Sequence, residues 1–188
     1  MIKAVIFDCF GVLTTDGWLP FVQKYFGDDK LLLQTAHDLN KQCDSRLLGY
    51  EEFVKKVSEM AHLEPYEARA EIQDNVANQP LFDYILSLKS KYKIGMLSNA
   101  ASNWLQELFS PEQVALFDEV VLSCDVGTTK PNERMYEMIA EKLGVEPSEC
   151  VFTDDSERYV TGAKDVGMQG ITYKEFASFK TQLDQLLN

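Results

Sequence analysis

The sequence predicts an α/β protein in which a parallel sheet is interrupted by an all-helical insertion. One observation is that apolar runs alternate with amphipathic segments over residues 79–188, as in parallel strands joined by right-handed helical crossovers. A second is that residues 17–78 show helical periodicity without a convincing strand. A third is the length of 188 residues, which suits one domain of ordinary size with a modest insertion.

The composition is that of a globular, acidic protein. Hydrophobic residues make up 45% of the chain and charged residues 26%, and the formal net charge is −12. This excess of carboxylates argues against a nucleic-acid or membrane surface, which needs clustered Lys and Arg, and favours a metal cation as partner. No apolar run approaches the roughly 18 residues of a membrane span. We therefore expect a soluble, cytoplasmic protein, present as a monomer or a homodimer.

The cysteines are expected to be reduced thiols. Cys9, Cys43, Cys124 and Cys150 form no C-x-x-C pair and lack the spacing of a zinc site. Cys9 directly follows Asp8, but both histidines of the chain lie in the predicted helical insertion. A Cys–His catalytic pair is therefore not expected.

The chain begins with a predicted buried strand that leads into a polar turn. Residues 2–7 are nearly all apolar, as in a strand that is covered on both faces. Asp8 follows at the carboxyl end of this strand, where open α/β sheets bind ligands. Gly11 allows the backbone to turn sharply there and to bring N–H groups close to an anion. Taken alone, Asp8 would be an ordinary turn aspartate.

The insertion is expected to contain four helices. The first has apolar residues at i, i+3 and i+4 spacing, and Pro65 suits the first turn of the fourth. The expected ranges are residues 18–26, 31–43, 50–57 and 65 to about 77.

The second half of the chain alternates helices and strands. Helices are expected over residues 81–90 and 101–109, from Pro131 to Leu143, and at the end of the chain. Strands are expected over residues 92–97, 119–123, 149–153 and 168–172. Polar residues follow several of these strands, namely Ser98-Asn99, Lys130 and Asp154-Asp155.

These polar residues are expected to meet Asp8, because the carboxyl ends of parallel strands lie at one edge of a sheet. Singly, each has a commonplace interpretation. Ser98-Asn99 suits a helix cap, Lys130 a solvated loop charge, and Asp154-Asp155 a turn. The combination is far more specific than any of its members.

Together the segments resemble the haloacid dehalogenase (HAD) superfamily over nearly the whole chain. The matching segments are Phe7-Asp8-x-x-Gly11-Val12-Leu13, Leu97-Ser98-Asn99, Val126-Gly127-x-x-Lys130-Pro131-x-x-x-x-Tyr136, and Val151-Phe152-x-Asp154-Asp155-Ser156 with Gly162-Ala163 and Gly167-Met168. The helical insertion lies between the first two motifs, as the C1 cap of that superfamily does. The resemblance implies a Rossmann-like core of residues 1–16 and 79–188 and a helical cap of residues 17–78.

The resemblance also implies a Mg²⁺-dependent phosphatase of a small phosphorylated metabolite, a sugar phosphate being one option. Asp8 would attack phosphorus and form an aspartyl-phosphate, which splits a difficult hydrolysis into two steps. Lys130 would balance the negative charge of Asp8 and the phosphate, and the Ser98 hydroxyl would hold phosphoryl oxygens. Gly11 and Asn99 are expected to bind the substrate together with Ser98 and Lys130.

The magnesium ion implied by the resemblance would have mostly oxygen ligands. Mg²⁺ prefers octahedral coordination with only one or two carboxylates plus water and substrate. The expected protein ligands are Asp8, the backbone carbonyl of Phe10 and Asp155, with Asp154 acting through a water.

Phe10 departs from the pattern of the superfamily. Most of its phosphatases have an aspartate at this position, which protonates the leaving oxygen and then deprotonates the attacking water. Phenylalanine can do neither, so metal binding should survive while acid–base catalysis is in doubt. Asp16 is a candidate substitute acid, although a solvated loop residue or helix N-cap is the plainer interpretation.

Two other functions remain open at this point. The 2-haloacid dehalogenases resemble this chain in having an aromatic residue at the position of Phe10, but they need no metal and typically have neutral residues in place of Asp154 and Asp155. A HAD-like protein that only binds a ligand would also fit the loss of the acid–base residue. Specificity is expected to depend on cap side chains, with Trp18, Phe21, Tyr25 and Arg46 as candidates.

Overall fold

The computed structural model describes residues 1–101 and 104–187. Its strands form one parallel five-stranded sheet in the order β3-β2-β1-β4-β5. The strands are β1 (Ala4–Phe7), β2 (Lys93–Ser98), β3 (Glu119–Leu122), β4 (Cys150–Asp154) and β5 (Gln169–Thr172). The predicted α/β fold with a parallel sheet is therefore confirmed.

The central strand β1 sets the register of the site. Phe7 pairs with Met96 on β2 and with Thr153 on β4. The Asp8 N–H then donates to the Thr153 carbonyl at 2.9 Å. The residues that end β1, β2 and β4 consequently lie side by side at one edge of the sheet.

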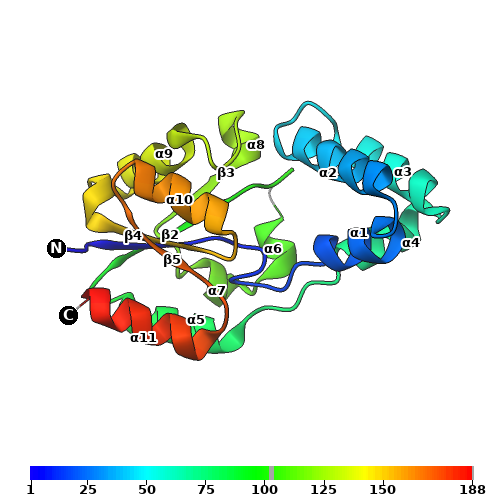
Figure 1. Cartoon of the computed structure of the whole chain (residues 1–188). Coiled ribbons are helices and arrows are strands. Elements are labelled where there is room, and N and C mark those ends of the chain that lie inside the picture. Colours follow the sequence, from blue (N-terminus) through cyan, green and yellow to red (C-terminus); the bar gives the residue numbers. More distant parts are fainter. Residues whose placement is uncertain (102–103, 188) are drawn as a thin grey trace.

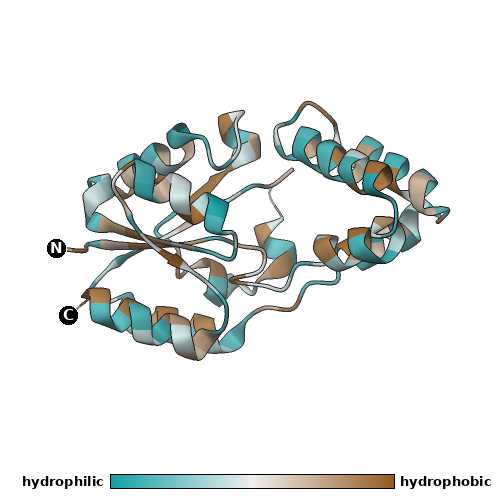
Figure 2. Cartoon of the chain, viewed as in Figure 1, coloured by the Kyte–Doolittle hydropathy of each residue, from teal (hydrophilic) through white to brown (hydrophobic). Residues whose placement is uncertain are grey.

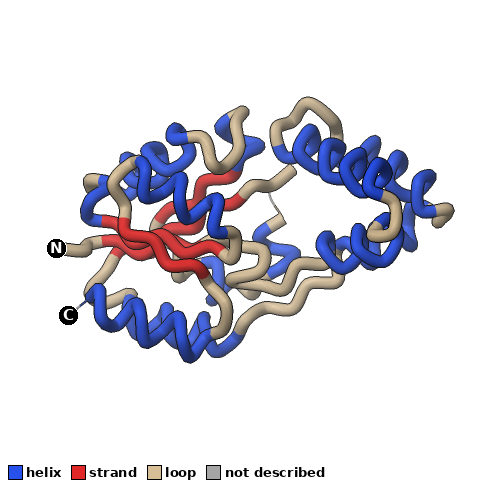
Figure 3. Tube along the Cα trace, viewed as in Figure 1, coloured by secondary structure: helices blue, strands red, loops and turns tan. Residues whose placement is uncertain are grey.

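Helices cover both faces of this sheet (Figures 1 and 3). On one face, α9 (Glu133–Leu143) and α10 (Glu157–Asp165) pack against Ala4 and Ile6. On the other, α5 (Gln79–Leu88) and α11 (Phe176–Leu187) pack against Val5 and Phe7. Burial on both faces explains why β1 is uniformly apolar. Shorter helices complete the core: α6 (Leu105–Leu108), α7 (Pro111–Val114), α8 (Ser123–Val126) and the 3₁₀ turn η1 (Pro147–Glu149).

The insertion forms a separate helical layer beyond the carboxyl edge of the sheet (Figure 1). It contains α1 (Trp18–Phe26), α2 (Lys30–Asp44), α3 (Tyr50–Ala61) and α4 (Pro65–Ile72). The helices α1, α2 and α3 are amphipathic, and hydrophobic residues from all four helices pack together (Figure 2). Trp18 packs against Phe53 with ring centroids 5.3 Å apart, so the helices bury an apolar core of their own.

The fourth helix of the insertion is shorter than predicted. It ends at Ile72 rather than near Ala77, because the following residues form an extended linker back to the core. The Thr15 N–H donates to the Val76 carbonyl at 3.0 Å, and the Val76 N–H donates to Thr15 Oγ1 at 2.8 Å. The outgoing and returning linkers therefore run side by side (Figure 1).

The helix predicted over residues 101–109 also differs. Residues 102–103 lie outside the described part of the chain, and the helix α6 extends only from Leu105 to Leu108. It ends because Phe109 has an extended backbone, with φ −129° and ψ 149°. Within the described residues, no helix is both long enough and apolar enough to cross a lipid bilayer.

Candidate active site

A buried lysine connects two carboxylates at the carboxyl edge of the sheet. Lys130 Nζ lies 2.7 Å from Asp8 Oδ1 and 2.6 Å from Asp154 Oδ2. It also donates to the Leu97 carbonyl at 3.2 Å, at the end of β2. All three charged side chains are buried. Three chain segments that are distant in sequence thus meet in one ionic cluster.

The electrostatics of this cluster follow from burial and from the excess of carboxylates. Burial raises the pKa of Asp8 well above its ordinary value, Asp154 raises it further, and Lys130 opposes both. Burial alone would lower the pKa of Lys130, but Asp154 and Asp8 outweigh it and hold that pKa above its usual range. Lys130 is therefore a permanent cation beside Asp8.

The carboxylates of Asp8, Asp154 and Asp155 fit a magnesium ion. One oxygen of each lies within 4.8 Å of the others. Burial, followed by repulsion from the charge of Asp154, raises the pKa of Asp155 to about 6, and Lys130 opposes this rise. A divalent cation would relieve this repulsion, and carboxylate oxygen is the ligand that Mg²⁺ prefers.

Asp154 is less free to bind a metal than its neighbours. Its Oδ2 contacts Lys130, and its Oδ1 accepts the Ser156 N–H at 2.9 Å. The contact of Asp154 with the ion through a water stays a prediction. The backbone carbonyl of Phe10 stays a predicted ligand.

Gly11 lies where a side chain would displace Asp155. Its φ is +76°, which L residues rarely adopt, and a Cβ there would lie 2.4 Å from Asp155 Oδ2. Its own N–H donates to the Thr14 carbonyl at 2.8 Å and closes the turn after Asp8. The glycine thus shapes the turn and makes room for Asp155.

Ser98 and Asn99 lie at the end of β2, as predicted, but their side chains have different hydrogen-bond partners. Ser98 is fully buried, and its hydroxyl contacts the Asn99 carbonyl at 3.3 Å. The Asn99 side chain accepts the Lys130 N–H at 2.8 Å and donates to the Lys130 carbonyl at 3.4 Å. Asn99 therefore positions the loop that carries Lys130.

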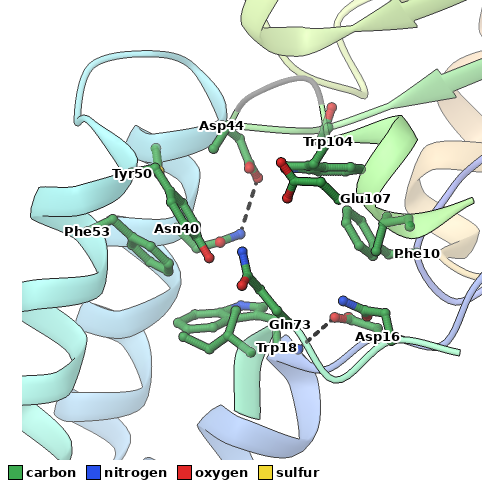
Figure 4. Close-up of a pocket in the computed structure, with 16 residues that line it drawn as sticks. Phe10, Asp16, Trp18, Asn40, Asp44, Tyr50, Phe53, Gln73, Trp104 and Glu107 are labelled. Carbon is green, nitrogen blue, oxygen red and sulfur yellow. Dashed lines mark hydrogen bonds between the residues drawn. The ribbon is translucent and has the colours of Figure 1, made fainter. Parts of the chain in front are cut away.

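A cavity of about 280 Å³ lies between the insertion and this edge of the sheet (Figure 4). Phe10 forms part of its wall and packs edge-on against Trp104, with ring centroids 4.7 Å apart. Apolar and aromatic side chains form more of the lining than carboxylates and amides do, and no lysine, arginine or histidine occurs among the described lining residues. The polar lining residues are Asp16, Asn40, Asp44, Gln73, Asn75, Asn99 and Glu107.

The cap residues predicted to set specificity are mostly elsewhere. Trp18 does line the cavity. Phe21 instead lies in the apolar core of the cap, and the Tyr25 hydroxyl donates to Glu71 at 2.8 Å. Arg46 pairs with Asp125 of the core at 3.3 Å. Helical spacing identified an apolar stripe, but apart from Trp18 its residues pack among the other cap helices rather than line the cavity.

Sequence reasoning missed most of the polar lining. Asn40 and Asp44 lie on the last turns of α2, and Gln73 and Asn75 lie in the linker that was predicted to be helical. These residues look like surface residues in the sequence, and no local signal distinguishes them. Only their position opposite the strand ends makes them candidates for binding.

The sheet order, the insertion after β1 and the ionic cluster at the strand ends place the protein among hydrolases with a Rossmann-like core and a helical cap. The family comparison makes this specific, because residues 2–167 match the model of the haloacid dehalogenase-like hydrolases. The chain belongs to this family. The predicted superfamily, fold and hydrolase class are therefore confirmed.

Known proteins resemble the chain over nearly its whole length. D-ribitol-5-phosphate phosphatase from Bacteroides thetaiotaomicron is 25% identical over 100% of both chains. A solved HAD-family enzyme from the same organism, in complex with magnesium and inorganic phosphate, has a TM-score of 0.76 and 25% identity over 95% of this chain and 98% of its own. The predicted magnesium cofactor agrees with that complex and with the cluster of three aspartates.

The dehalogenase branch is similar in fold. L-2-haloacid dehalogenase from Xanthobacter autotrophicus has a TM-score of 0.66 and 22% identity, and the match covers 90% of this chain and 76% of that one. At this identity the similarity concerns the fold alone.

Proposed function

We propose that the protein is a Mg²⁺-dependent phosphatase that hydrolyses a phosphate monoester of a small polyhydroxylated metabolite. The observation that carries the proposal is the cluster in which Lys130 lies 2.7 Å from Asp8 and 2.6 Å from Asp154, with Asp155 beside them. The magnesium and phosphate in a solved relative support the same assignment. Within this proposal, residues 17–78 act as a cap domain on a core formed by residues 1–16 and 79–188.

Asp8 is the nucleophile in this proposal. One of its carboxylate oxygens attacks phosphorus, and the bond between phosphorus and the leaving oxygen breaks. Water then hydrolyses the aspartyl-phosphate and restores the carboxylate. Lys130 Nζ, 2.7 Å from Asp8 Oδ1, opposes the rise that burial causes in the pKa of Asp8 and balances charge on the phosphoryl group.

Asp8, Asp155 and the Phe10 carbonyl would hold the ion, with Asp154 behind a water. When bound, Mg²⁺ supplies charge neutralisation at the phosphoryl oxygens. The Ser98 hydroxyl holds a phosphoryl oxygen at the end of β2. Asn99 acts by fixing the backbone of Lys130 with two hydrogen bonds.

The cavity beyond the cluster suits an uncharged polyol. Its carboxylates and amides offer several acceptors for hydroxyl groups, and the described lining has no cation to bind a second phosphate or a carboxylate. The relative from Bacteroides thetaiotaomicron is a D-ribitol-5-phosphate phosphatase, which is consistent with this chemistry.

The proposal is tested by the metal dependence of hydrolysis. The protein should hydrolyse 4-nitrophenyl phosphate with Mg²⁺ present and stop when EDTA is added. Metal-independent chloride release from 2-chloropropionate would instead indicate a dehalogenase. Neither reaction, with Mg²⁺ binding retained, would indicate a protein that only binds its ligand.

A further inference from the structure

The proposed phosphatase reaction leaves one role unfilled. An alkyl leaving group departs as an unstable anion unless a residue protonates it, and Phe10 has no proton to give. Three carboxylates line the cavity that would hold the leaving group, namely those of Asp16, Asp44 and Glu107. We propose that Asp44 of the cap protonates the leaving oxygen and then accepts a proton from the attacking water, an inference that rests on the proposed function.

The backbone of Asp44 is hydrogen-bonded to the core near the carboxyl end of β2, where the phosphate is proposed to bind. Asp44 is the last residue of α2, and its carbonyl accepts the Ser123 hydroxyl at 2.7 Å. The same hydroxyl oxygen accepts the Ala100 N–H at 2.9 Å, two residues after Ser98. One buried hydroxyl thus joins the cap at Asp44 to the loop that follows β2.

A second contact holds this corner of the cap in place. Arg46, two residues after Asp44, pairs with Asp125 of the core at 3.3 Å. Both side chains of this pair are exposed, so its contribution is small compared with that of the part-buried hydrogen bond from Ser123. Asp44 therefore keeps its position relative to Ser98 and Asn99.

The side chain of Asp44 faces the cavity that also touches Phe10 and Asn99 (Figure 4). Its Oδ2 accepts the Asn40 Nδ2–H at 3.2 Å, one turn earlier on α2. This bond orients the carboxyl group toward the space between cap and core. Asp44 thus lies across the cavity from Phe10, where the superfamily usually has its acid.

The protonation equilibrium of Asp44 suits a residue that must donate a proton in one step and accept a proton in the next. Burial raises its pKa to about 7, the charge of Lys130 opposes this rise, and the charge of Asp16 adds to it. Near neutral pH both forms are then present, which is the condition for acid catalysis in one step and base catalysis in the next. The titratable and charged groups that face it are Lys130 of the core loop, Asp16 of the linker, Cys43 and Tyr50 of the cap, Tyr159 of α10 and Glu107 of α6.

The other two carboxylates are less suited to the role. Asp16 Oδ1 accepts the Trp18 N–H at 2.8 Å, just before the N-cap residue of α1, so one of its carboxylate oxygens is already engaged. Glu107 is exposed, on a helix of only four residues. Asp44 is the carboxylate whose backbone is held by the Ser123 hydroxyl and whose pKa is raised to about 7.

Bonds and protons balance in both steps of the proposed reaction. In the first, the Asp8 oxygen bonds to phosphorus, the ester bond breaks, and the leaving oxygen takes the proton of Asp44. In the second, the Asp44 carboxylate takes a proton from water, the water oxygen bonds to phosphorus, and the bond from Asp8 breaks. Inorganic phosphate leaves, and Asp44 is again protonated.

The test is the variant Asp44→Asn, assayed on 4-nitrophenyl phosphate and on D-ribitol 5-phosphate with Mg²⁺. The alkyl ester should lose about 10²–10⁴-fold in kcat/KM, the range typical of general acid–base catalysis. The aryl ester should lose far less, because its leaving anion is stable without a proton. Wild-type kcat/KM for the alkyl ester should fall above pH about 7, and this limb should be absent in the variant.

Matched variants separate this role from a structural one. Asp38→Asn changes an exposed carboxylate on the same helix and should change neither rate. Equal losses on both esters in Asp44→Asn would overturn the proposal, as would selective loss of alkyl activity in Asp16→Asn instead. A wild type that hydrolyses only the aryl ester would also overturn it while leaving the phosphatase function intact. No hydrolysis of either ester would overturn the phosphatase function itself.

Discussion

Lys130 Nζ lies 2.7 Å from Asp8 Oδ1, and both side chains are buried at the carboxyl edge of the sheet. Asp154 contacts the same ammonium group at 2.6 Å, so one lysine faces two carboxylates. The cluster therefore carries net negative charge without a further cation. This imbalance favours the binding of a divalent cation, and Lys130 opposes the rise that burial and Asp154 cause in the pKa of Asp8.

Removing the charge of Lys130 should impair catalysis strongly. In Lys130→Met, the charge that opposes the rise caused by burial and Asp154 in the pKa of Asp8 would be lost, so that pKa should rise further. We expect kcat for 4-nitrophenyl phosphate to fall about 10²–10³-fold, as for other losses of transition-state charge stabilisation. The control Lys142→Met breaks an exposed pair with Glu119 and should leave kcat unchanged. Comparable rates in the two variants would contradict this role.

Gly11 should be required for metal binding rather than only for the turn. In Gly11→Ala, the new Cβ would meet Asp155 Oδ2 at 2.4 Å, so that carboxylate must move. Gly167→Ala is a matched control with φ +94° and no atom within 4 Å of the new Cβ. Both variants should lose about 1–3 kcal/mol of stability from backbone strain. Only Gly11→Ala should lose the rise in Tm on Mg²⁺ addition, and an undiminished rise would show that Asp155 lies elsewhere in solution.

Asp155 should account for stabilisation by magnesium. At free Mg²⁺ about 100 times Kd, binding adds about 2.7 kcal/mol of stability, or about 5–10 °C in Tm for a chain of this size. Asp155→Ala should abolish this rise in a thermal melt. Asp165→Ala, an exposed acid at the end of α10, should retain it. A variant at Asp155 that still gains the full shift would place the metal site elsewhere.

The core of the fold could be predicted because two signals agree along the chain. Strands buried on both faces produce uninterrupted apolar runs such as residues 4–7, and amphipathic helices separate them. The residues that follow β1, β2 and β4 then meet at one edge through register alone. The ionic cluster of Asp8, Lys130 and Asp154 was predictable for the same reason.

The cavity could not be predicted in this way. Asp44 and Asn40 lie on the polar part of an amphipathic helix, and periodicity does not show that this part faces the core. The prediction also extended the fourth helix to about Ala77, whereas α4 ends at Ile72 and Val76 lies 64% exposed in a linker. The position of the cap relative to the core determines both the lining of the cavity and the end of α4. Local sequence patterns do not encode that position.

The central claim is that Asp8 attacks phosphorus, and the variant Asp8→Asn tests it most directly. The amide has nearly the size of the carboxylate but lacks the attacking oxyanion, so the fold should be kept and a circular dichroism spectrum should be unchanged. The measurement is the steady-state rate of 4-nitrophenyl phosphate hydrolysis with saturating Mg²⁺. The account predicts a rate indistinguishable from that without enzyme, whereas a folded variant with turnover near that of the wild type would contradict it.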